Sequence, residues 1–181
     1  MRSDASISQS LSLEHFNVKE SSTGMSVKQM TNEELDNFLT CSRVSRLGVA
    51  LEDGAYVVPL GFGYSDGKIF FHTCNKGLKA DAIRRNPNVC FEVDEALSDA
   101  SMYKSVIILG VAEIIDDRCR MIPFLQKLID KYRVSSSLDE YLNKLGMNKE
   151  NELKAVRICI ITPKKITSRT YLRQPTPRMS A

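Results

Sequence analysis

The sequence predicts a mainly β fold, a small antiparallel barrel of about six strands with helices packed outside it. Three observations carry this prediction. Runs of alternating apolar and polar residues recur along the chain, as in half-buried strands. Asp-Gly pairs separate the first of these runs, and this dipeptide is a strong signal for a two-residue hairpin turn. The 181 residues suffice for one ordinary domain, and closing the sheet into a barrel leaves no strand edge unpaired.

Composition agrees with a globular domain and excludes other classes of protein. Hydrophobic residues make up 43% of the chain and charged residues 26%, close to the average for soluble domains. No apolar run reaches the roughly 18 residues of a membrane span, and the N-terminal stretch lacks a secretory apolar core. The net charge of +3 is too small to indicate nucleic-acid binding. We therefore expect a soluble, cytoplasmic protein that binds neither membranes nor nucleic acid.

Cysteine and histidine usage predicts neither disulfides nor a metal site. The five cysteines are odd in number and widely spaced, without a CxxC pair. The two histidines, His15 and His72, do not form a zinc-ligand motif. Cys90 and Cys159 lie in apolar strand-like runs, so we expect them to behave as core residues.

The first half of the chain is expected to contain one helix and a three-stranded meander. Residues 1–24 are rich in serine and have no sustained period, which predicts an extension. Thr31 and Glu34 form a capping box that starts a helix. Strands are predicted over residues 43–51, 56–64 and 68–72.

The second half is expected to alternate between strands and helices. Pro87 ends a short helix over residues 77–86. The other expected elements are strands at 89–94, 105–115 and 155–162, the last continuing over 163–171, a helix at 118–132 and a helical excursion at 135–151. The domain should therefore span residues 25–171, followed by a tail at 172–181.

One segment, residues 72–79 (HTCNKGLK), stands out as a candidate binding site. A strand ends in His72-Thr73, a glycine-containing loop follows, and a helix begins with Lys79 in its first turn. A helix start offers free N–H groups and partial positive charge, which suit a phosphate, and Thr73, Lys76 and Lys79 add a hydroxyl and two cations. The alternative is a solvated polar loop with a structural histidine. P-loop, dinucleotide-fingerprint and GxSxG motifs are absent from the sequence.

Four stretches in series resemble a known family. They are SRLGVALEDGAYVVPLGFGYSDGKIFFHT, GLKADAIRRNPNVCFEVDE, YKSVIILGVAEIIDD and VRICIITPKKITSR. In this order they resemble the FMN-binding split barrels related to pyridoxamine 5′-phosphate oxidase, most nearly the 5-nitroimidazole-resistance (Nim-like) branch. The resemblance implies a six-stranded split barrel that forms a homodimer with FMN at the subunit interface.

The resemblance also implies roles for individual residues. The strand Tyr56, Val57, Val58, Pro59 and Leu60 would run beside the flavin ring, with His72 and Thr73 at the flavin and its phosphate-bearing chain. Lys79 would bind the phosphate, helped by Lys76. Ser105 would contact the flavin from the partner subunit, and Arg46 is a further candidate. The oxidases carry an Arg-Lys pair where this chain has Leu78-Lys79, and their C-terminal Trp and Arg substrate motif is absent, so we do not expect vitamin B6 oxidation.

The resulting functional hypothesis is an FMN-dependent oxidoreductase that reduces nitroaromatic or quinone-like small molecules with a nicotinamide donor. His72 would orient the substrate or transfer a proton. Two other classes remain open. One is a flavin-binding or electron-carrier module without its own substrate. The other is a haem-binding relative with His72 or a tail residue as axial ligand. Deazaflavin use on the same fold is also open.

Overall fold

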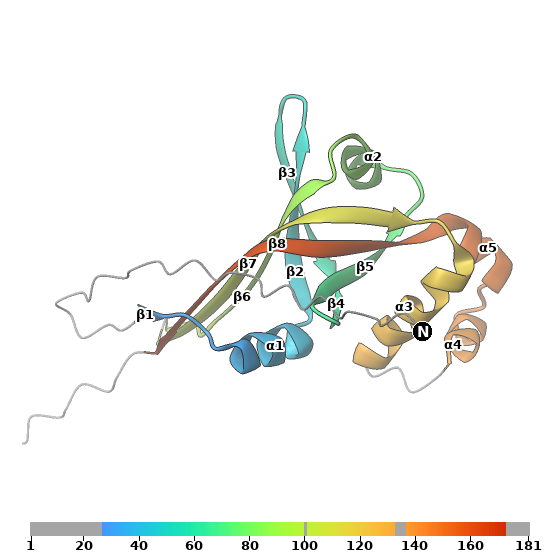
Figure 1. Ribbon diagram of the computed structural model, residues 1–181. Coiled ribbons are helices and arrows are strands. Elements are labelled where there is room, and N and C mark those ends of the chain that lie inside the picture. Colours follow the sequence, from blue (N-terminus) through green and yellow to red (C-terminus); the bar gives the residue numbers. More distant parts are fainter. Residues whose placement is uncertain (1–26, 100, 133–136, 173–181) are drawn as a thin grey trace, which may run out of the picture.

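A computed structural model of the protein describes residues 27–99, 101–132 and 137–172 (Figure 1). The strands are β1 (Val27–Lys28), β2 (Val44–Leu51), β3 (Gly54–Gly61), β4 (Gly63–Ser65), β5 (Lys68–Cys74), β6 (Asn88–Ala96), β7 (Met102–Ile115) and β8 (Val156–Leu172). The helices are α1 (Asn32–Cys41), α2 (Leu78–Arg85), α3 (Arg118–Lys131), α4 (Leu138–Lys144) and α5 (Lys149–Ala155).

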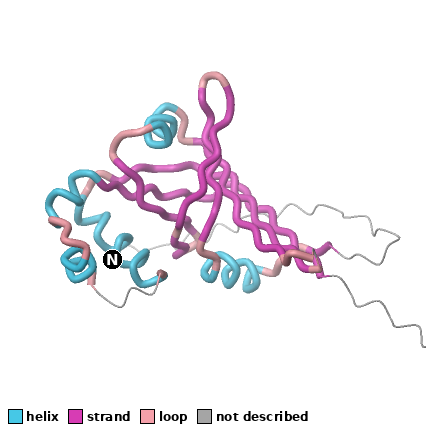
Figure 2. The backbone as a smooth tube through the Cα atoms, turned by 180° about the vertical axis from the view of Figure 1, so that it is seen from behind, coloured by secondary structure: helices cyan, strands magenta, loops and turns pink. Residues whose placement is uncertain are grey.

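The strands form one antiparallel sheet that is strongly twisted and curls on itself (Figures 1 and 2). Their order is β3-β2-β6-β7-β8-β5-β4, and the short β1 pairs with β8. β3 and β4 lie at the two ends of this path, and no pairing between them occurs within the described residues. The barrel is therefore split between β3 and β4, and β3 keeps one open edge.

The two faces of the sheet bury different apolar clusters. Inside the barrel, Phe71 and Phe91 belong to a large core that α1 and α2 complete with Leu39 and Ile83. On the other face of β5, Phe70 packs in a second cluster beneath α3. That cluster also contains Ile115, Met121, Leu128, Ile158 and Ile160. Alternation along β5 thus sends neighbouring residues to opposite environments.

The predicted mainly β, antiparallel class is confirmed, but the predicted meander is wrong. The run expected as one strand over residues 56–64 breaks at Phe62 into β3 and β4, which lie at opposite ends of the sheet. Phe62 is fully buried against Phe91, with ring centroids 5.1 Å apart. Gly63 allows the Phe70 ring to approach so closely that any Cβ at this position would overlap it. Tertiary packing therefore breaks the strand at Phe62, although the strand-like sequence pattern runs on through residue 64.

Local signals for turns and caps are confirmed. Asp66 and Gly67 have φ values of 54° and 70°, as a type I′ turn requires. Thr31 Oγ1 accepts a hydrogen bond from the Glu34 N–H (3.2 Å), and the Glu34 carboxylate accepts one from the Thr31 N–H (2.8 Å).

The expected helices form, and they pack in three places around the sheet, with α1 beside β4. α2 packs against β2 and β7, whereas α3, α4 and α5 lie together beside β5 and β8 (Figure 1). α4 and α5 occupy the region expected to be a helical excursion, and the continuation of the last strand is confirmed by the 17 residues of β8.

Two expectations concern cysteines and chain ends. Cys159 is buried as expected, but the core assignment of Cys90 is wrong, because its side chain faces outward from β6 and is exposed. The predicted extension at 1–24 lies outside the described residues, as does the predicted tail apart from Leu172, so these boundaries remain predictions. Among the helices described, none combines the length and apolar character needed to cross a membrane.

Candidate functional site

The loop between β5 and α2 forms an open helix start that we call the anion cradle, made of Thr73, Lys76, Gly77 and Lys79. Gly77 precedes α2 with φ +123°, a conformation that glycine adopts most readily, and no side chain caps the helix. The first N–H groups of a helix lack partners within it. No described atom lies within 4 Å of the position that a Cβ at Gly77 would occupy. The cradle therefore has donors and room beside them.

The loop that carries the cradle is held in place by its neighbours. Arg84, in the last turn of α2, donates hydrogen bonds to the Asn75 carbonyl oxygen (2.8 Å) and to Asn75 Oδ1 (2.9 Å). The Asn75 N–H donates to the Ala155 carbonyl oxygen at the end of α5 (2.9 Å). These bonds fix Asn75, so Lys76 and Gly77 start from a defined position.

Lys79 and Thr73 face the barrel side of β5. Thr73 is buried, and Lys79 Nζ lies 5.3 Å from the centroid of the buried Phe71 ring. Burial of the Lys79 ammonium lowers its pKa below the ordinary value. An anion beside Lys79 would offset that desolvation and favour the charged amine. Lys76, in contrast, is exposed on the loop.

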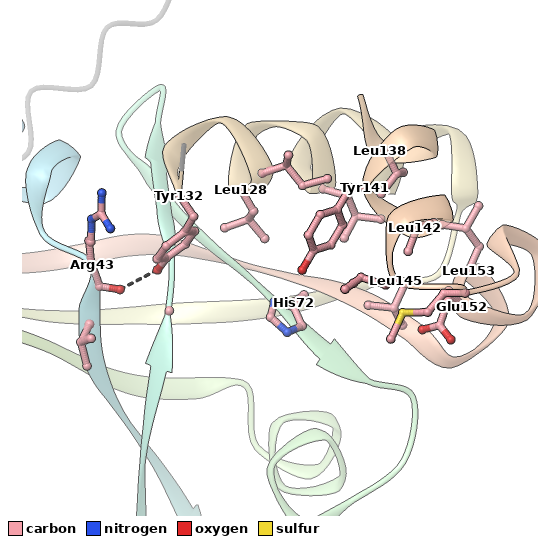
Figure 3. Close-up of a pocket in the computed structure, with 16 residues that line it drawn as sticks. Arg43, His72, Leu128, Tyr132, Leu138, Tyr141, Leu142, Leu145, Glu152 and Leu153 are labelled. Carbon is pink, nitrogen blue, oxygen red and sulfur yellow. Dashed lines mark hydrogen bonds between the residues drawn. The ribbon is translucent and has the colours of Figure 1, made fainter. Parts of the chain in front are cut away.

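His72 faces the opposite side of β5, toward α3 and α4 (Figure 3). No hydrogen bond to its imidazole occurs within the described part of the chain. Burial, and secondly the positive charge of Lys79, lower the pKa of His72 below its ordinary value. The lowered pKa favours the neutral ring, in which one nitrogen donates and one accepts, although the side chain is still exposed to solvent. Thr73 and His72, adjacent in sequence, thus belong to the two different faces of one strand.

The predicted flavin strand is the open edge of the sheet. β3 pairs only with β2, so alternate backbone groups of residues 56–60 point away from the sheet without a strand partner. Val57 is 59% exposed, and Pro59 is also exposed. Proline is tolerated there because an edge strand does not require every N–H. Tyr56, Val58 and Leu60 are half-buried against the barrel core.

The two remaining candidates lie away from the cradle within one chain. Arg46 forms ion pairs with Glu92 and Asp94 on the neighbouring β6, so its guanidinium already has two carboxylate partners. Ser105 is buried on β7 and pairs with Arg169 of β8, whereas His72 pairs with Ile158 of the same strand. These eleven positions along β8 correspond to about 35 Å at roughly 3.3 Å per residue.

A cavity of about 510 Å³ opens between β5 and the three helices α3, α4 and α5, and the sequence analysis did not predict it. Its walls are mostly apolar (Figure 3). They consist of Arg43, Val44, Gly61, His72, Leu125, Leu128, Ile129, Tyr132, Leu138, Tyr141, Leu142, Leu145, Met147, Glu152, Leu153 and Val156. Several of its leucines come from the segment 135–151, which the sequence predicted only as a polar helical excursion, so nothing indicated that it would enclose space beside His72.

Tyr132, at the end of α3, fixes one wall of this cavity and was also missed. Its hydroxyl donates to the Arg43 carbonyl oxygen (2.5 Å) and accepts a hydrogen bond from the N–H of the buried Phe62 (3.1 Å). A Cβ at Gly61 would overlap this hydroxyl. The break between β3 and β4 is thus tied to α3 through one side chain.

The split-barrel fold is shared with known proteins. Residues 31–170 match the pyridoxamine 5′-phosphate oxidase family, and the chain belongs to that family. The resemblance seen in the sequence is therefore confirmed at the level of the family.

Individual relatives are more distant. An FAD-binding protein from Mesorhizobium loti is 28% identical, with a TM-score of 0.58, and the match covers 82% of this chain and 98% of that one. A putative 5-nitroimidazole antibiotic resistance protein from Bacteroides thetaiotaomicron has a TM-score of 0.67 at 18% identity, covering 87% and 96%. An uncharacterized protein of Rhizobium meliloti is 29% identical over 86 residues, which span 48% of this chain and 56% of that relative. Placement in the Nim-like branch remains a prediction.

Proposed function

We propose that this protein is an FMN-binding oxidoreductase in which the anion cradle holds the flavin phosphate. The observation that carries the proposal is the open, uncapped start of α2 beside Thr73 and the half-buried Lys79, in a sheet whose strand β3 has a free backbone edge. Helix N–H groups and a lysine suit a phosphate, and the open edge of β3 suits the polar rim of a flavin ring. The residues present therefore fit the group, and membership of the family supports the same reading.

The proposed chemistry is the reduction of a nitroaromatic or quinone-like molecule with electrons from a nicotinamide donor. FMN, when bound, supplies hydride-transfer and electron-transfer chemistry. The protein's own contribution is positional: the cradle binds the phosphate, and the neutral His72 offers a hydrogen bond to a substrate oxygen. His72 is solvent-exposed beside apolar cavity walls, so a bound substrate would itself displace water there.

A homodimer would complete the site. Because Ser105 lies eleven positions along β8 from the His72 row, a contour of about 35 Å, we expect it to contact the flavin of a second copy of the chain. The outward face of the sheet supports such pairing, since Val57, Ile107 and Leu109 are 59%, 42% and 47% exposed. In the strand register, Val57 and Leu109 are linked through Gly48 and Cys90 in one cross-strand row. Exposed apolar patches of this kind are typical of interfaces.

Titration of the purified protein with FMN and, separately, with FAD tests the cofactor, because a similar structure is described as an FAD-binding protein. We expect the absorption bands of protein-bound flavin with FMN, at one flavin per chain. Protein that stays colourless with both flavins would contradict the proposal, and a sharp haem Soret band after purification would replace it with the haem alternative.

Turnover of a quinone with NADH or NADPH tests the reaction. At equal FMN occupancy, His72→Ala should lower kcat, by up to the 100-fold or so at the lower end of general acid–base catalysis. An unchanged kcat would show that His72 has no role in the reaction. Flavin binding without turnover over a panel of donors and acceptors would favour a carrier module.

A further inference from the structure

The cavity beside His72 has the size of a small-molecule site. Ligand pockets usually measure roughly 300–1,000 Å³ and combine apolar walls with a few polar groups. This cavity measures about 510 Å³ and is lined by side chains of α3, α4 and α5, such as Leu128, Leu142 and Leu153. At its rim, Leu145 is 50% exposed and Met147 42% exposed. A bound apolar molecule would cover both.

Two hydrogen-bonding groups face this apolar space. The His72 ring enters from β5 and the Tyr141 side chain from α4, both turned toward the cavity in Figure 3. Neither ring has a hydrogen-bond partner within residues 27–99, 101–132 and 137–172. A polar atom of a ligand, such as a carbonyl oxygen, would therefore find donors without displacing an existing bond.

The charge of the lining is uneven. Glu152 lines the α5 wall, is half-buried and has no ion-pair partner among the described residues. Three basic side chains of neighbouring elements form ion pairs with other carboxylates: Lys149 with Asp139 (2.5 Å), Arg157 with Asp116 (2.5 Å) and Arg118 with Glu150 (2.8 Å).

The other charged lining residue, Arg43, does not balance Glu152. Its backbone carbonyl accepts a hydrogen bond from Tyr132, and its guanidinium lies 6.0 Å from the centroid of the Tyr132 ring, turned away from Glu152 (Figure 3). Glu152 is therefore the acidic side chain of the lining, and an occupant would meet a carboxylate that forms no ion pair with a described residue.

We infer that this cavity binds a hydrophobic ring compound that carries a hydrogen-bond acceptor and is uncharged or cationic, and that it discriminates against carboxylates and sulfonates of the same shape. His72 and Tyr141 hold the acceptor, and Glu152 disfavours the anion through Coulomb repulsion in a partly dry site. As a binding site the cavity does not depend on a flavin. As the substrate site of the oxidoreductase it rests on the proposed function.

A matched pair of probes tests the inference without cofactor. 2-Acetylnaphthalene and 2-naphthoate share a naphthalene ring and a hydrogen-bond acceptor and differ in charge. Neither compound reacts covalently with the exposed cysteines. Equilibrium dialysis of the full chain, without added flavin, should show about tenfold tighter binding of the ketone, a difference of roughly 1.4 kcal/mol. Equal binding of the two probes, tighter binding of the naphthoate or binding of neither would overturn the inference.

Variants assign the preference to the cavity. Glu152→Gln should leave the ketone affinity unchanged and bring naphthoate binding to within about twofold to threefold of it, because only the charge is removed. Leu145→Trp should weaken both probes at least several-fold, whereas Leu97→Trp, an equally exposed leucine beyond β6, should change neither. A Glu152→Gln variant with the full tenfold preference would contradict the role of Glu152.

The same experiment separates this inference from the proposed function. If the chain binds the ketone but never binds FMN, the inference about the cavity is supported and the proposed oxidoreductase function is contradicted. If the chain binds FMN but not the ketone, the proposed function is supported and the inference about the cavity is contradicted.

Discussion

The two sides of β5 differ in what they offer a ligand. On the barrel side, Thr73 and Lys79 lie beside an open helix start, where backbone donors and positive charge dominate. On the helical side, His72 faces a cavity with apolar walls and one unpaired carboxylate, Glu152. Strand alternation places these environments within one dipeptide. Two adjacent residues in sequence can thus present environments of opposite chemistry.

The largest expected effect comes from removing the cation of the barrel side. Lys79→Ala should weaken FMN binding by about 10- to 100-fold, because a hydrogen bond to a charged group contributes roughly 1.5–3 kcal/mol. FMN fluorescence quenching measures the affinity. Lys68→Ala, an exposed lysine at the other end of β5, is the matched control and should bind FMN as the wild type does. Equal loss in both variants would mean that general charge, rather than the cradle, attracts the flavin.

A second effect should fall on the helical side. Tyr132→Phe leaves the Phe62 N–H and the Arg43 carbonyl without their hydroxyl partner. The free energy of unfolding should fall by about 1–3 kcal/mol, the usual cost of an unsatisfied buried group. Urea denaturation measures this, with Tyr103→Phe, whose ring is 39% exposed, as the control. A change below about 0.5 kcal/mol, typical of a surface substitution, would show that this tie between α3 and the strand break is dispensable.

The smallest effect is electrostatic coupling through β5. Because the positive charge of Lys79 contributes to the lowered pKa of His72, Lys79→Met should raise that pKa toward its ordinary value of 6.5. NMR titration of the imidazole measures it, and His72→Gln identifies the signal. An unchanged or lower midpoint would show that the two sides are electrostatically independent.

The same pKa has a consequence for stability. The folded-state pKa of His72 lies below its unfolded value. At pH values between the two, His72 is protonated more often in the unfolded chain than in the folded one. His72 therefore reduces stability as the pH falls below about 6.5. Lys79→Met should make this loss smaller.

Local chemistry explains why much of the fold was predictable. The Thr31–Glu34 capping box and the Asp66-Gly67 turn depend on residues close together in sequence. The alternation of apolar and polar residues predicts the strands directly. The break at Phe62 was not predictable in this way. It depends on the Phe70 ring and the Tyr132 hydroxyl, and Tyr132 lies 70 residues away along the chain.

The candidate site shows the same division. The anion cradle was predictable because Thr73, Lys76, Gly77 and Lys79 are close in sequence. The cavity was not, since its walls come from elements between Arg43 and Val156. Glu152, on a polar helix, carried no sequence signal that would connect it to His72.

A crossed titration tests most directly the central claim, that β5 separates a flavin cradle from a hydrophobic pocket. FMN and 2-acetylnaphthalene are each titrated into the wild type, Lys79→Ala and Leu145→Trp. The account predicts that Lys79→Ala loses FMN affinity but keeps the ketone, and that Leu145→Trp loses the ketone but keeps FMN. Loss of both ligands in either variant, or of neither in both, would contradict it.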